Sequence, residues 1–147
     1  LLNIWQKFAG RHLFSEGLLS IFCGIHSIAG ACRLASISGN RDIATVAAIL
    51  TAFVAYLIFY AQLVRMYSLL SLLVAIVAWA YWKAISTAKA PSAWGWALLV
   101  VSSAALIYVH YYGIIVLAAI GLYHMLFAAK DKRWLQVCAA MIVAGLA

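Results

Sequence analysis

Long apolar runs, separated by short polar or charged segments, follow one another along the whole chain. The runs show no period-two alternation of apolar and polar residues, so they predict helices and not the strands of a barrel. A helix that crosses a bilayer needs about 20 apolar residues. The breaks therefore define an amphipathic lead-in and six expected spans, of which the last is incomplete. These segments are the lead-in 1–16 and the spans 17–37, 43–62, 67–83, 93–110, 112–129 and 134–147.

The residues at the breaks are those that end or begin helices. Ser38-Gly39-Asn40 is a turn cluster, because Gly and Asn adopt positive φ readily. Pro91 is the single proline of the chain; it can end one helix while Ser92 caps the next. The uncharged stretch from 90 to 129 is about twice the length of one span. We expect it to fold back at His110-Tyr111-Tyr112-Gly113.

The amino-acid composition predicts whether water or lipid surrounds this chain. Hydrophobic residues make up 69% and charged residues 9% of the 147 positions, against about 45–50% and about 25% in soluble domains. So few polar groups cannot cover a water-exposed surface. In lipid, a helix satisfies its own backbone hydrogen bonds. The sequence therefore predicts an all-α, polytopic transmembrane helix bundle, with residues 1–147 as a single membrane region and no second domain.

The positive charges predict the orientation. With the lead-in placed on side one, that side holds three of the 10 Lys and Arg residues, and side two holds the other seven. The seven are Arg33, Arg41, Lys83, Lys89, Lys130, Lys132 and Arg133. The positive-inside rule makes side two cytoplasmic in a multi-pass inner-membrane protein. The net charge of +7 thus has a topological role, and we expect no nucleic-acid partner.

This orientation puts the N-terminal lead-in on the outer face of the membrane. The chain begins at Leu1, with neither an initiating Met nor a signal peptide that would export it. The expectation is that at least one helix precedes this segment in a longer protein.

Arg65 is an exception to the charge pattern, because it lies at an outer turn that otherwise carries little positive charge. The turn runs from Tyr60 to Tyr67 and also contains Gln62. A guanidinium at the outer interface suits a bidentate contact to a phosphate. The alternative is an interfacial anchor, with Tyr60 and Tyr67 as members of the aromatic belt.

Four histidines occur in the chain, three of them in or beside the expected spans. His110, with Tyr111 and Tyr112, lies at an outer turn and could donate to a sugar hydroxyl or a phosphate, or belong to the aromatic belt. His26 and His124 lie within spans at poorly matched depths. We interpret them as hydrogen-bonded packing residues, with haem ligation as the alternative.

The sequence contains no clear signal for a metal site or for catalytic residues. The three cysteines, at positions 23, 32 and 138, have no metal-binding spacing and are interpreted as small apolar filling. No pair of carboxylates and no nucleophile constellation occurs. We therefore assign no catalytic residue, no metal site and no certain cofactor to this segment.

Several motifs together resemble a known family. Tyr60-Ala61-Gln62-Leu63-Val64-Arg65-Met66-Tyr67-Ser68-Leu69-Leu70 is similar to the YxQxARMYxLL signature of GT-C type, polyprenyl-phosphate-dependent glycosyltransferases of the family-39-like group, which includes protein mannosyltransferases and aminoarabinose transferases. Segments 18–24, 47–50, 107–113 and 132–135 resemble its helix start, its AALL stretch, its YTHYFG turn and its RRWL loop, in the same order.

The resemblance implies the membrane part of an enzyme that moves a sugar from a polyprenyl-phosphate donor to an acceptor on the outer face. It implies that Arg65, Gln62 and Tyr67 bind the donor phosphate. Tyr60, His110, Tyr111 and Tyr112 would line the outer cavity. Leu63 departs from the family, which often has Glu there, and so does Gly17, where an arginine is common. The family's catalytic acid, and any divalent metal it uses, would lie upstream of this segment.

A second hypothesis comes from another class of protein. The chain would be a non-catalytic membrane subunit that packs against partners in a larger respiratory or photosynthetic complex. An Asp-Glu-containing outer loop encoded upstream would favour the enzyme, and a start codon close to Leu1 would favour the subunit. A transporter would need paired broken helices, which the sequence does not predict.

Overall fold

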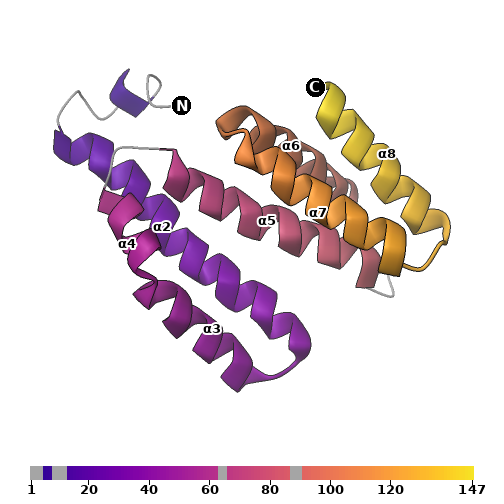
Figure 1. Ribbon diagram of the computed structural model, residues 1–147, viewed down its shortest axis with the longest axis horizontal. Helices are drawn as coiled ribbons and strands as arrows, with labels where there is room; N and C mark the ends of the chain where they lie inside the picture. Colours follow the sequence, from indigo (N-terminus) through magenta and orange to yellow (C-terminus); the bar gives the residue numbers. More distant parts are fainter. Residues whose placement is uncertain (1–4, 8–12, 63–65, 87–90) are drawn as a thin grey trace. The chain divides into compact units, whose positions relative to one another are not determined.

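The computed structural model describes residues 5–7, 13–62, 66–86 and 91–147 (Figure 1). These residues are helical and contain no strand, so the expected all-α class is confirmed for this part of the chain. The helices are α2 (Leu13–Ala35), the 3-10 turn η1 (Ser36–Ser38), α3 (Arg41–Phe53), α4 (Ala55–Gln62), α5 (Tyr67–Ser86), α6 (Ala93–Val109), α7 (Tyr112–Phe127) and α8 (Lys132–Leu146).

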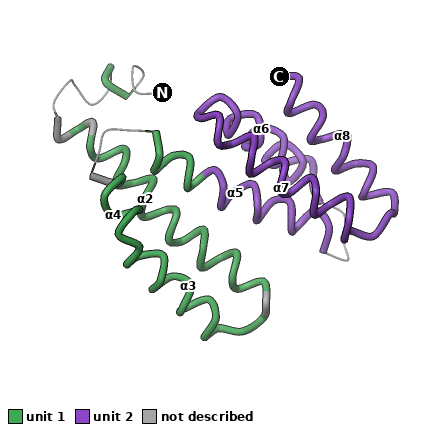
Figure 2. Tube along the Cα trace, in the orientation of Figure 1, with its two compact units in different colours: residues 1–72 green, residues 73–147 purple. Residues whose placement is uncertain are grey.

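The chain forms two compact units, residues 1–72 and 73–147, and α5 passes from the first into the second (Figure 2). In the first unit, α2 packs against both α3 and α4. In the second unit, α6 packs against both α7 and α8. Each unit is thus organised around one helix that contacts two others.

Short polar side chains begin the helices where the sequence predicted breaks. Gly39 has φ of 75°, and Asn40 then caps α3 by accepting a hydrogen bond from the Asp42 N–H at 2.8 Å. Ser92 caps α6, with its Oγ 3.3 Å from the Gly95 nitrogen. Asp131 caps α8 through the Trp134 N–H at 2.9 Å. These caps satisfy backbone donors that have no partner within their helices.

The expected span over 43–62 is not one continuous helix. The helix ends at Phe53, Val54 takes an extended conformation with φ of −64° and ψ of 110°, and α4 begins at Ala55. Neither glycine nor proline occurs at this break, so local sequence does not impose it. Because both pieces pack against α2, the change of direction is a consequence of tertiary packing.

Packing inside both units uses small side chains. On α2, the buried residues Ser20, Cys23 and Ser27 recur at helical spacing, and the Ser27 hydroxyl donates to the Cys23 carbonyl at 2.8 Å. In the second unit, two pairs of buried alanines lie four residues apart, Ala80 with Ala84 on α5 and Ala140 with Ala144 on α8. Small residues allow helix backbones to approach closely, as they do in membrane proteins.

Many large apolar side chains, in contrast, face outward. Phe53 is 78% exposed on α3 and Phe127 is 72% exposed on α7. Ile49, Leu50, Ile115, Leu122 and Leu126 are also exposed. Leu99 and Leu106 on α6 are nevertheless fully buried, so the interior of the second unit combines leucines with small residues.

Two described helical segments, Gly17–Ala35 and Tyr67–Ser86, are long and apolar enough to cross a membrane. Helices α6 and α7 are also apolar but have 17 and 16 residues, below the usual length of about 20. The six-span bundle is therefore supported at two segments, and the remaining spans stay predictions.

Candidate functional site

Two tyrosines flank the segment that contains Arg65. Arg65 itself lies outside the described residues, and Gln62 is the last residue of α4, with its side chain also outside the description. The Tyr60 and Tyr67 rings are 4.3 Å apart, with an interplanar angle of 56°. The structure therefore brings together two of the residues that the sequence assigned to one site.

A hydrogen bond reinforces this aromatic contact. The Ser68 hydroxyl donates to the Tyr60 carbonyl at 3.0 Å, and Ser68 is buried. The end of α4 and the start of α5 are thus joined by a ring contact and by a hydrogen bond. Ser68 was not predicted as part of this site, although a hydroxyl directly after Tyr67 in an apolar run was a usable signal.

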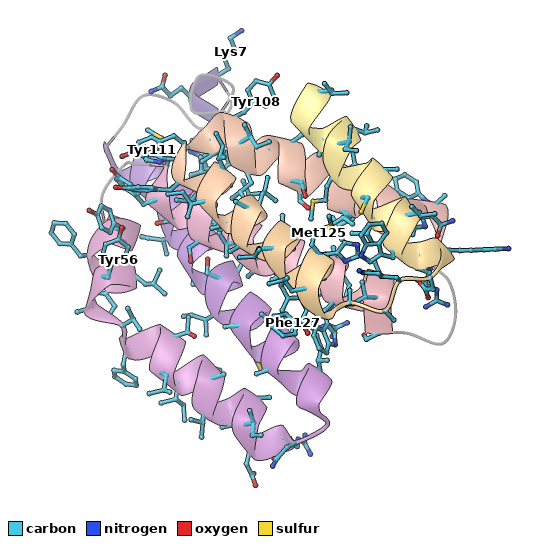
Figure 3. All side chains as sticks on the ribbon, turned by 45° about the vertical axis from the view of Figure 1, so that its right-hand side comes forward. Lys7, Tyr56, Tyr108, Tyr111, Met125 and Phe127 are labelled. Carbon is cyan, nitrogen blue, oxygen red and sulfur yellow. The ribbon has the colours of Figure 1, made fainter. Side chains whose placement is uncertain are left out.

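Two more rings extend the contact along α4. Tyr56 lies 4.4 Å from Tyr60, and Phe59 lies 5.3 Å from Tyr60 in an edge-to-face arrangement. We call Tyr56, Phe59, Tyr60 and Tyr67 the tyrosine cluster. Tyr56, labelled in Figure 3, is 57% exposed, so the cluster presents a phenol at the surface of the first unit.

The second predicted group lies at the α6–α7 turn of the other unit. His110 is the C-cap of α6, and its Nδ1 accepts a hydrogen bond from the Tyr112 N–H at 3.2 Å. The ring of His110 lies 4.3 Å from that of Tyr111 and 4.8 Å from that of Tyr112, and the two tyrosine rings are 4.4 Å apart. The turn therefore holds three rings in mutual contact, with the His110 and Tyr112 rings stacked and Tyr111 exposed (Figure 3).

Gly113 allows this turn to be tight. A Cβ at position 113 would lie 2.3 Å from the Leu106 carbonyl oxygen and 2.7 Å from its carbonyl carbon. No side chain can occupy that space without moving backbone atoms of α6. The structure thus explains the glycine that follows the three rings.

Both groups offer aromatic faces together with hydrogen-bonding groups. Tyrosine hydroxyls donate and accept, and a neutral histidine has one donor and one acceptor nitrogen. Such an arrangement can contact a polar ligand that also has apolar surface. Because the tyrosine cluster and the His110 turn belong to different units, each is described by itself.

His124 forms a third polar group, deep in the second unit. It is 3% exposed, with its Nδ1 at 3.1 Å from the Tyr81 hydroxyl and its Nε2 at 3.1 Å from the Trp134 carbonyl. A carbonyl oxygen can only accept, so Nε2 carries the proton, and Nδ1 of the neutral ring accepts from Tyr81. The expected hydrogen-bonded packing role is confirmed for His124.

The sequence did not identify the partners of His124. Tyr81 and Trp134 lie in apolar runs on α5 and α8. Each carries a single polar group, the Tyr81 hydroxyl and the Trp134 ring N–H. Buried tyrosine and tryptophan usually find a hydrogen-bond partner, which was the available signal. His26 differs: it is exposed on α2, and its Nδ1 contacts the Phe22 carbonyl of its own helix at 2.8 Å.

Cys23 is buried beside the small residues of α2, and the three cysteines are free thiols. In the described part of the chain, no three His, Cys, Asp or Glu residues are grouped so as to hold a metal ion. Comparison of this chain with family models, with curated proteins and with solved structures gives no match.

Proposed function

We propose that this chain is embedded in a lipid bilayer. The proposal is supported by two helical segments of spanning length, in which only 17% and 28% of the residues are buried. A core helix of a soluble protein would be mostly buried. The small buried residues and the exposed large apolar residues fit lipid as the surrounding solvent.

Within that setting, we propose that the chain is the membrane part of a glycosyltransferase that uses a polyprenyl-phosphate sugar donor at the outer face. The observation that carries this proposal is the contact between Tyr60 and Tyr67 across the segment containing Arg65. These residues belong to the stretch that resembles the family signature, and their contact joins the two flanks of the Arg65 segment. A guanidinium positioned there would bind the donor phosphate through charge-assisted hydrogen bonds.

The His110 turn is proposed to contribute to the outer cavity. Its exposed Tyr111 ring offers an apolar face and a hydroxyl. In the predicted topology, this turn and the Arg65 segment lie on the same side of the membrane, opposite the basic loops. That side is where donor and acceptor would meet.

The decisive experiment measures sugar transfer from a radiolabelled polyprenyl-phosphate donor by the full-length gene product in proteoliposomes. Replacing Arg65 by Ala should lower turnover by about 10- to 100-fold, the effect of losing a hydrogen bond to a charged group. Arg65→Lys should retain part of the activity, because it keeps the charge but not the bidentate geometry.

Arg41→Ala is the matched control, because it removes the same charge from the exposed start of α3 on the predicted cytoplasmic side. Its turnover should stay within twofold of the unchanged protein. Wild-type turnover in the Arg65→Ala protein would exclude the phosphate role. A correctly inserted protein that transfers no sugar but copurifies with other membrane chains would instead support a non-catalytic subunit.

A further inference from the structure

The hydroxyl of Ser68 bonds to a different helix, whereas other buried hydroxyls bond within their own. Ser27 on α2 and Ser102 on α6 each donate to the carbonyl four residues earlier, at 2.8 Å and 2.5 Å, which is a usual bond for a hydroxyl inside a helix. Ser68 is the second residue of α5, so the residue four positions earlier precedes that helix. Its hydroxyl instead donates to the Tyr60 carbonyl of α4 at 3.0 Å.

This bond satisfies a polar group at each of two helix ends. Tyr60 is among the last four residues of α4, whose carbonyls have no donor within the helix. Ser68 is 3% exposed, and a buried hydroxyl without a partner is costly. The bond therefore pairs a carbonyl at the end of α4 with a buried hydroxyl at the start of α5.

Tyr60 is held from α5 at two points. Its ring lies 4.3 Å from that of Tyr67, and its carbonyl accepts the hydrogen bond of the next residue, Ser68. The hydrophobic part of a ring contact has no preferred direction, whereas a hydrogen bond weakens steeply when its angle changes. Because the two contacts come from adjacent residues, they fix both the separation and the direction of the start of α5 relative to the end of α4.

The Ser68–Tyr60 bond acts on the whole tyrosine cluster, because Tyr60 is its central ring. Tyr56 and Phe59 contact Tyr60 from α4, at 4.4 Å and 5.3 Å, and Tyr67 contacts it from α5. The hydroxyl of Ser68 is itself too buried to reach a ligand at the surface. A change at Ser68 would therefore be transmitted through the position of the rings and not through a contact with the donor.

We propose that Ser68 is a positioning residue for the polyprenyl-phosphate donor: its bond holds Tyr60 and Tyr67 at the separation at which the donor binds. The proposal rests on the proposed function, in which these two tyrosines border the donor site. Without the bond, binding of the donor would also have to order the two rings, and this ordering lowers affinity. A loss of binding that is equal in the ground state and the transition state raises KM and leaves kcat unchanged.

Sugar transfer by the full-length gene product in proteoliposomes, measured over a range of donor concentrations, separates KM from kcat. Ser68→Ala should raise the KM for the donor by about 3- to 10-fold, the effect of losing one neutral hydrogen bond. Its kcat should stay within about twofold of the unchanged protein. Ser27→Ala is the matched control, because it removes an equally buried hydroxyl of the same unit that also donates to a carbonyl. Both its KM and its kcat should stay within about twofold.

Spin labels at positions 58 and 66 test the Ser68–Tyr60 bond without sugar transfer. In a full-length protein that lacks other cysteines, Ile58→Cys and Met66→Cys place the labels at exposed positions on α4 and directly before α5. Electron paramagnetic resonance measures the distribution of distances between them. This distribution should be broader when Ser68→Ala is added and unchanged when Ser27→Ala is added.

An unchanged KM in Ser68→Ala would overturn the proposal, and so would equal increases in the two variants, which would show a general effect of a lost buried hydrogen bond. An unchanged distance distribution would overturn it as well, because the bond would then not hold the two helix ends. If the unchanged protein transfers no sugar, the proposed function fails and the donor role of Ser68 fails with it. Transfer that is indifferent to Ser68 leaves the proposed function standing, so the two failures are distinguishable.

Discussion

His124 and Trp134 bind each other through two reciprocal hydrogen bonds. Each ring N–H donates to the backbone carbonyl of the other residue, at 3.1 Å from His124 and at 3.2 Å from Trp134. The stacked rings fasten the last turn of α7 to the first turn of α8. Tyr81 completes the group from α5. Three helices of the second unit are therefore joined by one polar cluster.

Tyr81→Phe should destabilise the protein by about 1–3 kcal/mol, because it leaves His124 Nδ1 buried without its hydrogen-bond donor. Unfolding in detergent, followed by circular dichroism, measures this change. Tyr108→Phe is the control: it also removes a phenolic hydroxyl with a hydrogen bond, to the Ala147 carbonyl, but Tyr108 is 76% exposed. Its effect should stay within about 0.5 kcal/mol. Equal losses in the two variants would contradict a structural role for the Tyr81–His124 bond.

Gly113→Ala should destabilise the α6–α7 turn by about 1–3 kcal/mol, because the added methyl group would overlap backbone atoms of Leu106. Gly121→Ala lies in the same helix, where a Cβ would meet nothing within 4 Å. It should be neutral, or stabilising by up to about 1 kcal/mol, because alanine favours the helix. The same unfolding assay compares the two substitutions. Better stability of Gly113→Ala than of Gly121→Ala would refute the close packing at Leu106.

Ala55→Pro tests the break between α3 and α4. Proline suits the first position of a helix, and Val54 before it already has the extended conformation that proline prefers. The substitution should therefore change stability by less than about 1 kcal/mol. Ala48→Pro, in the middle of α3, should cost about 3 kcal/mol or more. If Ala55→Pro is as damaging as Ala48→Pro, the helix is continuous over 43–62.

Cysteine labelling from the two sides of the membrane tests the predicted orientation. In a background without Cys23, Cys32 and Cys138, Met66→Cys should react with an impermeant maleimide added from outside intact cells, because position 66 is 49% exposed beside the Arg65 segment. Lys132→Cys should react only after the cells are opened, because the basic loop is predicted to be cytoplasmic. The reverse pattern of labelling would invert the topology and remove the basis for an outer phosphate site.

Much of the candidate site could be predicted, because its residues lie close together in the sequence. The turn at His110 and the pairing of Tyr60 with Tyr67 were predictable, because a break in a long apolar run brings its two flanks together. The ring contacts at His110 also join residues that are neighbours in the chain. In contrast, the partners of His124 lie 43 and 10 residues away along the chain, and no local pattern specified which side chains its two nitrogens would meet.

The sequence by itself determined the helical class, the breaks at 38–40, 90–92 and 110–113, and the cap of α6 by Ser92. Hydrophobic run length, charge and capping chemistry act over a few neighbouring residues, so they can be read directly from the order of residues. Only the tertiary structure decided that the 43–62 segment breaks at Val54, that Gly113 faces the backbone of Leu106, and that the Ser68 hydroxyl meets the Tyr60 carbonyl. These features depend on contacts between helices, where the shape of a distant partner and not the local pattern sets the backbone direction and the space that remains.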